Sequence, residues 1–224
     1  MRFFPLLLVT VAAFAAAPKG AVVWTASFEN GDCFPEVKNF SRDLAQKVNS
    51  VPSSYVDVTW QSTVTHSGKY AEREHTTRDP GNLDKGASHR GYCFQNWRST
   101  NGAPISTPIM VTAWVYLEKF DSQDWFSFIT LISTPTEGYP NGTILTLDML
   151  ASRELTVWCQ PKHQNGPDFH IEQTKRPGTK VPLNQWVKLQ VYLDWNGSDG
   201  ALKVWQDDDL SVETLARVAS QAQD

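Results

Sequence analysis

The segment from Ile109 to Leu117 alternates strictly between two sets of side chains. Successive side chains of a β-strand point to opposite faces, whereas a helix repeats after about 3.6 residues. A two-residue period therefore predicts a strand with one face in a core. One face holds Ile109, Val111, Ala113, Val115 and Leu117, and the other holds Met110, Thr112, Trp114 and Tyr116.

Short strand-like segments recur along the chain, and turn residues such as those of Ala151-Ser152-Arg153 separate them. The run from Trp125 to Ile132 is apolar on both faces, which predicts a central strand. Strands without alternating helices favour an all-β, two-sheet antiparallel sandwich of the jelly-roll type. The further predicted strands are Val22 to Phe28, Tyr55 to Val64, Tyr70 to Thr77, Tyr92 to Trp97, Thr143 to Leu150, Glu154 to Gln160, Phe169 to Gln173, Gln185 to Asp194 and Ala201 to Gln206.

The strand pattern predicts one jelly-roll domain over residues 22–206, a length that a single β-sandwich often reaches. Asp207-Asp208-Asp209 follows where a glycine-containing turn is expected, and Ser211 to Asp224 is rich in Ala and Gln. Residues 207–224 are therefore predicted to be a divergent or truncated tail, so that the sandwich lacks its last strands.

The amino terminus resembles a signal peptide. Arg2 precedes an apolar run from Phe3 to Phe14, and Ala13-Phe14-Ala15 offers a cleavage site. The run is far shorter than the roughly 20 residues that a membrane-spanning helix needs. We expect a leader over residues 1–15, no membrane span, and a secreted or extracytoplasmic protein, in the periplasm or at the cell surface.

Charge and cysteine content narrow the class of protein. A net charge of −4 lacks the basic excess of a nucleic-acid-binding domain. In an oxidising compartment, one pair among Cys33, Cys93 and Cys159 could close, and the sequence leaves all three pairings open.

One face of the strand from Gln185 to Asp194 is polar and aromatic, and similar residues recur on two other strands. Indole and phenol rings can stack on sugar rings, and amides and cations can bind their hydroxyl and carboxylate groups. This pattern predicts a polysaccharide-binding surface, and the alternative is an ordinary solvated sheet face. The predicted glycan-binding residues are Trp158, Trp186, Lys188, Gln190, Tyr192, Lys203 and Trp205.

A catalytic alternative is a polysaccharide lyase that cleaves an acidic glycan by β-elimination. Such an enzyme neutralises a uronate carboxylate and moves two protons, for which Arg73, His75 and Tyr192 are the candidates. Hydrolysis is less favoured, although Glu72 and Glu74 share a face, because the E-x-D-x-x-E signature of jelly-roll hydrolases is absent. Whether the chain is an enzyme stays open.

Glu29 ends the first predicted strand, in Phe28-Glu29-Asn30-Gly31. A carboxylate at such a corner is a possible ligand for structural calcium, and the alternative is a simple turn.

Three stretches together resemble secreted bacterial concanavalin A-like (laminin G-like) jelly-roll proteins of the lectin/glucanase type, including the heparin-lyase-like polysaccharide lyase group. They are Trp24 to Asp32, His66 to Ala71, and Asn184 to Tyr192 with Leu202 to Gln206. The resemblance implies the fold and a carbohydrate ligand. It carries over no catalytic residue, because the stretch from Trp125 to Leu131 lacks the Gln-x-His element found in the lyases.

Overall fold

The computed structural model describes residues 22, 25–29, 56–76, 105–121, 125–132, 144–160, 169–194 and 201–215. The chain divides into one unit that spans residues 20–106 and another that contains residues 107–224. Within the described residues there is no helix, and every paired strand is antiparallel. The prediction of an all-β antiparallel protein is confirmed.

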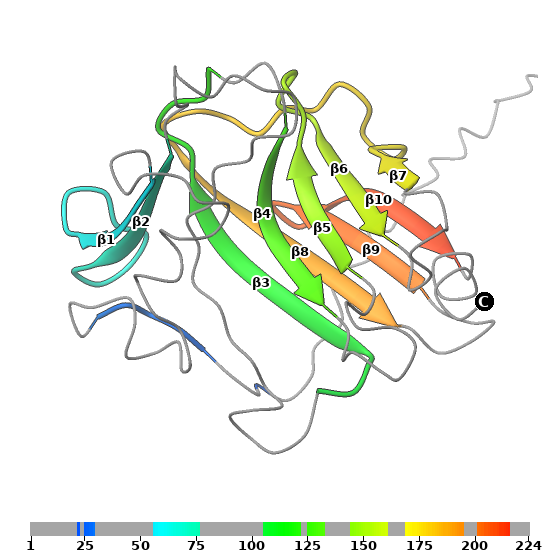
Figure 1. The fold of residues 1–224 in the computed structure, drawn as a ribbon, viewed down its shortest axis with the longest axis horizontal. Coiled ribbons are helices and arrows are strands. Elements are labelled where there is room, and N and C mark those ends of the chain that lie inside the picture. Colours follow the sequence, from blue (N-terminus) through cyan, green and yellow to red (C-terminus); the bar gives the residue numbers. More distant parts are fainter. Residues whose placement is uncertain are drawn as a thin grey trace, which may run out of the picture. The chain divides into compact units, whose positions relative to one another are not determined.

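The unit that contains residues 107–224 is built from two four-stranded sheets (Figure 1). One sheet has the order β10-β9-β8-β3, and the other has the order β4-β5-β6-β7. The strands of the first are β3 (Ile109–Tyr116), β8 (Trp186–Asp194), β9 (Ala201–Gln206) and β10 (Asp209–Leu215). Those of the second are β4 (Phe126–Ile132), β5 (Ile144–Met149), β6 (Leu155–Gln160) and β7 (Phe169–Glu172).

The two sheets share one hydrophobic core, as the layers of a sandwich do. Alternation along the strands supplies it: every second residue of β8, from Val187 to Leu193, is at most 1% exposed. Leu145, Leu147, Leu155 and Val157 meet them from β5 and β6. Burying one such side chain contributes roughly 1.5–3 kcal/mol, so this shared core fixes which side of each sheet faces outward.

The hairpin between β5 and β6 forms where the sequence predicted it. Arg153 donates its backbone N–H to the Leu150 carbonyl at 2.8 Å, and Leu150 donates to Glu154 at 2.9 Å. Arg153 has a left-handed φ of 69°, as the last residue of a three-residue hairpin loop commonly does. This tight turn sets the register that pairs Asp148 with Thr156 across the two strands.

Strand β10 corrects the predicted tail. Asp207 and Asp208 have φ angles of 52° and 71° and join β9 to β10, whose first residue Asp209 pairs with Gln206. A two-residue loop with positive φ at both positions is the favoured hairpin turn, and aspartate tolerates that conformation. The prediction that no strand follows Gln206 is wrong, because the two aspartates adopt the positive φ angles for which a glycine was expected.

Strand β4 corrects a second prediction. Within the described strands it pairs only with β5, at the end of its sheet, and Trp125 and Ile132 at its two ends are 54% and 53% exposed. The apolar run reflects aromatic packing, because Phe126 contacts both Phe120 and Phe128 edge to face. Among the described strands, this apolar segment therefore forms an edge strand and not the predicted central one.

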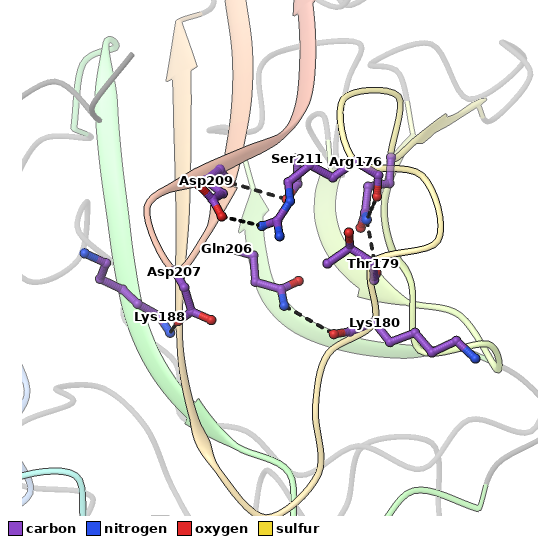
Figure 2. Close-up of polar contacts among 9 residues, drawn as sticks. Arg176, Thr179, Lys180, Lys188, Gln206, Asp207, Asp209 and Ser211 are labelled. Carbon is purple, nitrogen blue, oxygen red and sulfur yellow. Dashed lines mark hydrogen bonds and ion pairs between the residues drawn. The ribbon is translucent and has the colours of Figure 1, made fainter. Parts of the chain in front are cut away.

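Residues 173–184, which we call the strap, connect β7 to β8 and touch both sheets. Val181 is fully buried in the core, and its backbone bonds Arg153 of the β5–β6 hairpin. Toward the other sheet, Arg176 forms an ion pair with Asp209 at 3.0 Å, and the Lys180 carbonyl accepts a hydrogen bond from Gln206 at 3.3 Å (Figure 2). The strap thus ties the sheets together at β10.

The unit spanning residues 20–106 contains the hairpin of β1 (Val56–Gln61) and β2 (Ala71–Thr76). The Trp60 and Tyr70 rings meet edge to face, with their centroids 4.6 Å apart. No strand forms over residues 25–28, contrary to the prediction for Val22 to Phe28. There Phe28 takes a left-handed φ of 61°, which is incompatible with a strand.

Several predictions concern residues outside the described ones. They are the leader over residues 1–15, the strand from Tyr92 to Trp97, and the roles of Cys33 and Cys93. Cys159 is fully buried in β6. Within the described part of the chain, no helix has the length and apolar character that crossing a membrane requires.

Candidate functional site

The outer side of the β10-β9-β8-β3 sheet, which we call the β8 face, brings together most of the predicted glycan-binding residues. Trp186, Lys188, Gln190 and Tyr192 alternate with the core residues of β8, and Lys203 lies opposite Tyr192 on β9. On the other side of β8, the register with β3 adds Tyr116 opposite Trp186, Trp114 opposite Lys188, Thr112 opposite Gln190 and Met110 opposite Tyr192.

Aromatic rings from two strands form the accessible part of this face. Trp114 is 45% exposed, and the Lys188 ammonium lies 5.9 Å from its ring centroid. The Tyr116 and Trp186 rings lie beside them, with centroids 5.5 Å apart. Trp114 and Tyr116 were not predicted as site residues. Alternation placed them on one face, but only the pairing of β3 with β8 shows that this face continues the predicted one.

Trp205 does not belong to the accessible platform. It lies opposite Gln190 on β9 but is only 1% exposed. A ring that is covered on both sides cannot stack on a sugar. Its predicted role as a binding residue is therefore corrected to a packing role.

The lysines of the β8 face are both paired with acids. Lys188 forms an ion pair with Asp208, and Lys203 forms one with Glu213 at 3.0 Å. Glu213 also contacts Lys175 at 3.1 Å, and the hydrogen bonds from Lys203 and Lys175 lower its pKa. Because each cation has a neighbouring carboxylate, the face carries little net positive charge with which to attract a polyanion.

Gln190 supplies the amide of this face. Its Nε2 donates to Thr112 Oγ1 at 3.2 Å across the β3–β8 pair. Its Oε1 is buried and has no hydrogen-bond partner in the described part of the chain. This oxygen is shielded from solvent, so the group that Gln190 offers to a ligand is the Nε2 that bonds Thr112 and not the oxygen.

Trp158 lies on the other sheet. It is half-buried on β6, on the outer side of the β4-β5-β6-β7 sheet, which we call the β6 face. The prediction grouped it with Trp186 because both share a face with polar residues, but the shared core separates the two faces. The sequence period gives the face of a strand, not the sheet to which the strand belongs.

The β6 face carries two rows of side chains at paired positions. The first row is Ser127, Asp148, Thr156 and Glu172, and the second is Thr130, Thr146, Trp158 and His170. The centre is buried, with Thr146 6%, Asp148 4% and Thr156 2% exposed, whereas Thr130, His170 and Glu172 at the rim are exposed.

Asp148 is the buried carboxyl of this face. Burial raises its pKa above the ordinary value, opposed by a hydrogen bond from Ser127 and by the nearby Thr146 hydroxyl and His170. The Ser127 Oγ donates to its Oδ1 at 2.6 Å. Thr146 lies near enough to favour the charged carboxyl, yet its hydroxyl makes no hydrogen bond of ordinary length within the described residues.

The predicted lyase residues lie in different units. Arg73 and His75 are exposed on β2, opposite Thr59 and Asp57, and share a face with the buried Ala71. Tyr192 is half-buried on β8 in the other unit. Whether the three converge on one ligand stays a prediction.

Glu29, the predicted calcium ligand, holds a turn. Its carboxylate accepts the backbone N–H of Lys69 at 2.8 Å and that of Tyr70 at 3.2 Å, and these bonds lower its pKa. Gly68 makes room for it, because a Cβ there would lie 2.3 Å from the carboxyl carbon. Two of the stretches behind the resemblance thus meet here. Calcium binding stays a prediction, and the described residues contain no group of three His, Cys, Asp or Glu arranged to hold a metal.

The chain matches no family model, no curated protein and no solved structure. Its chemistry is therefore inferred from its own residues.

Proposed function

We propose that the chain is a secreted, polysaccharide-binding domain of the jelly-roll type that binds its ligand on the β8 face. The jelly-roll assignment is supported by the connections, since the chain passes from one sheet to the other between β3 and β4 and returns between β7 and β8. Export rests on the sequence of residues 1–15.

The observation that carries the proposal is the exposed Trp114 beside the Tyr116–Trp186 pair. Isolated exposed aromatic residues are common, but three rings on adjacent positions of two strands form a continuous apolar strip. A pyranose ring has an apolar C–H face that fits such a strip. Gln190 and Thr112, next along the same strands, offer polar groups for its hydroxyls.

The chemistry favours a neutral polysaccharide. Lys188 and Lys203 each have a carboxylate partner, so a uronate would have to displace it. Stacking and neutral hydrogen bonds change little with salt, in contrast to binding of a polyanion, which is screened. We therefore expect binding to hold when the ionic strength rises from low to physiological values.

Affinity electrophoresis tests the proposal. The purified protein is run in native gels that contain laminarin, hydroxyethylcellulose, xylan or alginate. At least one neutral polymer is expected to retard it, and Trp114→Ala and Trp186→Ala should reduce the retardation. Trp60→Ala, which removes a ring that is 42% exposed on β1 in the other unit, is the matched control. Retardation that Trp114→Ala and Trp186→Ala leave unchanged would contradict the proposal.

The same samples test the lyase alternative. β-Elimination leaves a conjugated double bond in the product, so alginate and other uronate polymers are followed by ultraviolet absorbance. A rise that Arg73→Ala or Tyr192→Phe abolishes would favour the lyase over the simple binder.

A further inference from the structure

We propose that the β6 face is a second saccharide-binding site, separate from the β8 face, that takes a neutral, hydroxyl-rich chain. Its buried centre and exposed rim come from four adjacent strands, β4 to β7. Because antiparallel pairing fixes the register, its two polar rows are held by the backbone ladder and not by loops.

The centre of this face contains an unsatisfied hydroxyl. Thr146 is 6% exposed and points away from the core. Its hydroxyl lies close enough to the Asp148 carboxyl to lower the pKa of that group, but it has no hydrogen-bond partner of good geometry in the described part of the chain. The equivalent hydroxyl on β6, that of Thr156, is satisfied by the Ile171 carbonyl at 3.1 Å. A buried polar group without a partner costs stability, so a bound hydroxyl that completes its hydrogen bonding would be favoured.

Asp148 supplies a second group for such a ligand. Ser127 occupies one carboxyl oxygen, Oδ1, and the carboxyl lies in the same row as Glu172 at the rim. A carboxyl kept in a buried position at a cost to its charged form is a common property of binding and catalytic sites. In either protonation state it can bond to a sugar hydroxyl.

The charges of this face and its tryptophan ring indicate which kind of ligand it would bind. The two rows contain the carboxyls of Asp148 and Glu172 and, within the described residues, no lysine or arginine. They would repel a polyanion. Trp158, half-buried in the middle of the second row between Thr146 and His170, offers a ring for the apolar side of a sugar. A neutral oligosaccharide meets all three conditions.

The test uses the full chain with the β8 face disabled, as Trp114→Ala/Trp186→Ala. Laminarihexaose and cellohexaose are titrated calorimetrically, after a gel screen with the neutral polymers above. This double variant should still bind a neutral saccharide. Adding Thr146→Val should weaken that binding by about three- to tenfold, the size of one neutral hydrogen bond, without lowering the urea midpoint. Thr174→Val, the same exchange at an exposed strap position on neither face, should change nothing.

Asp148→Asn and Trp158→Ala should weaken the residual binding further, and the unfolding midpoint of each variant checks that it is folded. Loss of all neutral-saccharide binding in the Trp114/Trp186 double variant would overturn the second site and leave the first intact. Residual binding that Thr146→Val, Asp148→Asn and Trp158→Ala leave unchanged would overturn it as well. If the double variant binds like the wild type and Thr146→Val weakens it, the β8 face fails and the β6 face stands.

Discussion

Asp207, in the turn between β9 and β10, bonds both backbone groups of Lys188 on the neighbouring strand β8. The Asp207 backbone N–H donates to the Lys188 carbonyl at 2.9 Å, and the Lys188 N–H donates to the Asp207 carboxylate, also at 2.9 Å (Figure 2). The β9–β10 turn therefore extends the ladder of β8 by one residue. It holds β8 at the point where Lys188 faces Trp114.

Asp207→Ala should destabilise the protein by about 1–2 kcal/mol, because it removes one hydrogen bond and leaves a positive φ of 52° without a side chain that favours it. Asp207→Asn keeps both features and should cost less than about 0.5 kcal/mol. Urea unfolding measures the difference. A loss below about 0.5 kcal/mol for Asp207→Ala as well would show that this side chain does not hold the turn.

Gly68→Ala should destabilise the unit that spans residues 20–106 more than Gly178→Ala destabilises the other unit. Both glycines have positive φ, 66° and 81°, but an added Cβ meets Glu29 at the first and open space at the second. The strain alone costs about 1 kcal/mol, so Gly178→Ala sets the baseline. Limited proteolysis at residues 56–76, together with thermal unfolding, compares them. Similar losses would mean that Glu29 moves away freely.

Glu29→Gln should reduce the loss of stability in acid. The pKa of Glu29 is lowered in the folded state, so the unfolded chain binds more protons as the pH falls. The stabilisation by its carboxylate is present above the ordinary pKa of 4.5 and is lost as the pH falls through the lowered value. Unfolding midpoints between neutral pH and pH 3 measure this trend, with the exposed Glu118→Gln as a control. Parallel profiles for the wild type and Glu29→Gln would refute it.

Asp148→Asn should show the opposite trend. Burial raises the pKa of Asp148, so the folded state holds its proton more tightly and the wild type loses stability as the pH rises above the ordinary value of 3.8. The amide has no charge to bury. The stability of Asp148→Asn relative to that of the wild type should therefore increase between pH 3 and neutrality. Each unit of pKa shift corresponds to about 1.4 kcal/mol. A constant difference between the two proteins over this range would contradict the raised pKa.

Except for β10, the strand positions of the unit that contains residues 107–224 followed from the sequence, because a buried core enforces a two-residue period. The run from Gln185 to Asp194 is one example, since its alternation predicted the buried and outward residues of β8 correctly. Sheet membership did not follow, and Trp158 was therefore grouped with Trp186. Alternation is a local signal, whereas the partner of a strand depends on contacts between distant segments.

The candidate sites were less predictable than the strands. Trp205 has the sequence context of a platform residue, and its burial depends on what lies above the sheet. Asp148 sits in an apolar-looking strand, and its only sequence signal was a lone acid between Leu147 and Met149. A charged residue in a buried strand is a signal that could have singled it out, because acidic residues are seldom fully buried unless they are paired.

The strap also determines how strand β10 meets its surroundings. β10 is the last strand of its sheet among the described ones, and its register shifts at Ser211, whose carbonyl accepts the Lys175 N–H at 3.1 Å. Ion pairs from Lys175 and Arg176 to Glu213 and Asp209 cover the same strand. An irregular, covered edge is a poor template for strand exchange between molecules. Cleavage of the strap at the exposed Gly178 would release these contacts from β10. Self-association of the cleaved protein would then measure how far the strap protects this edge strand.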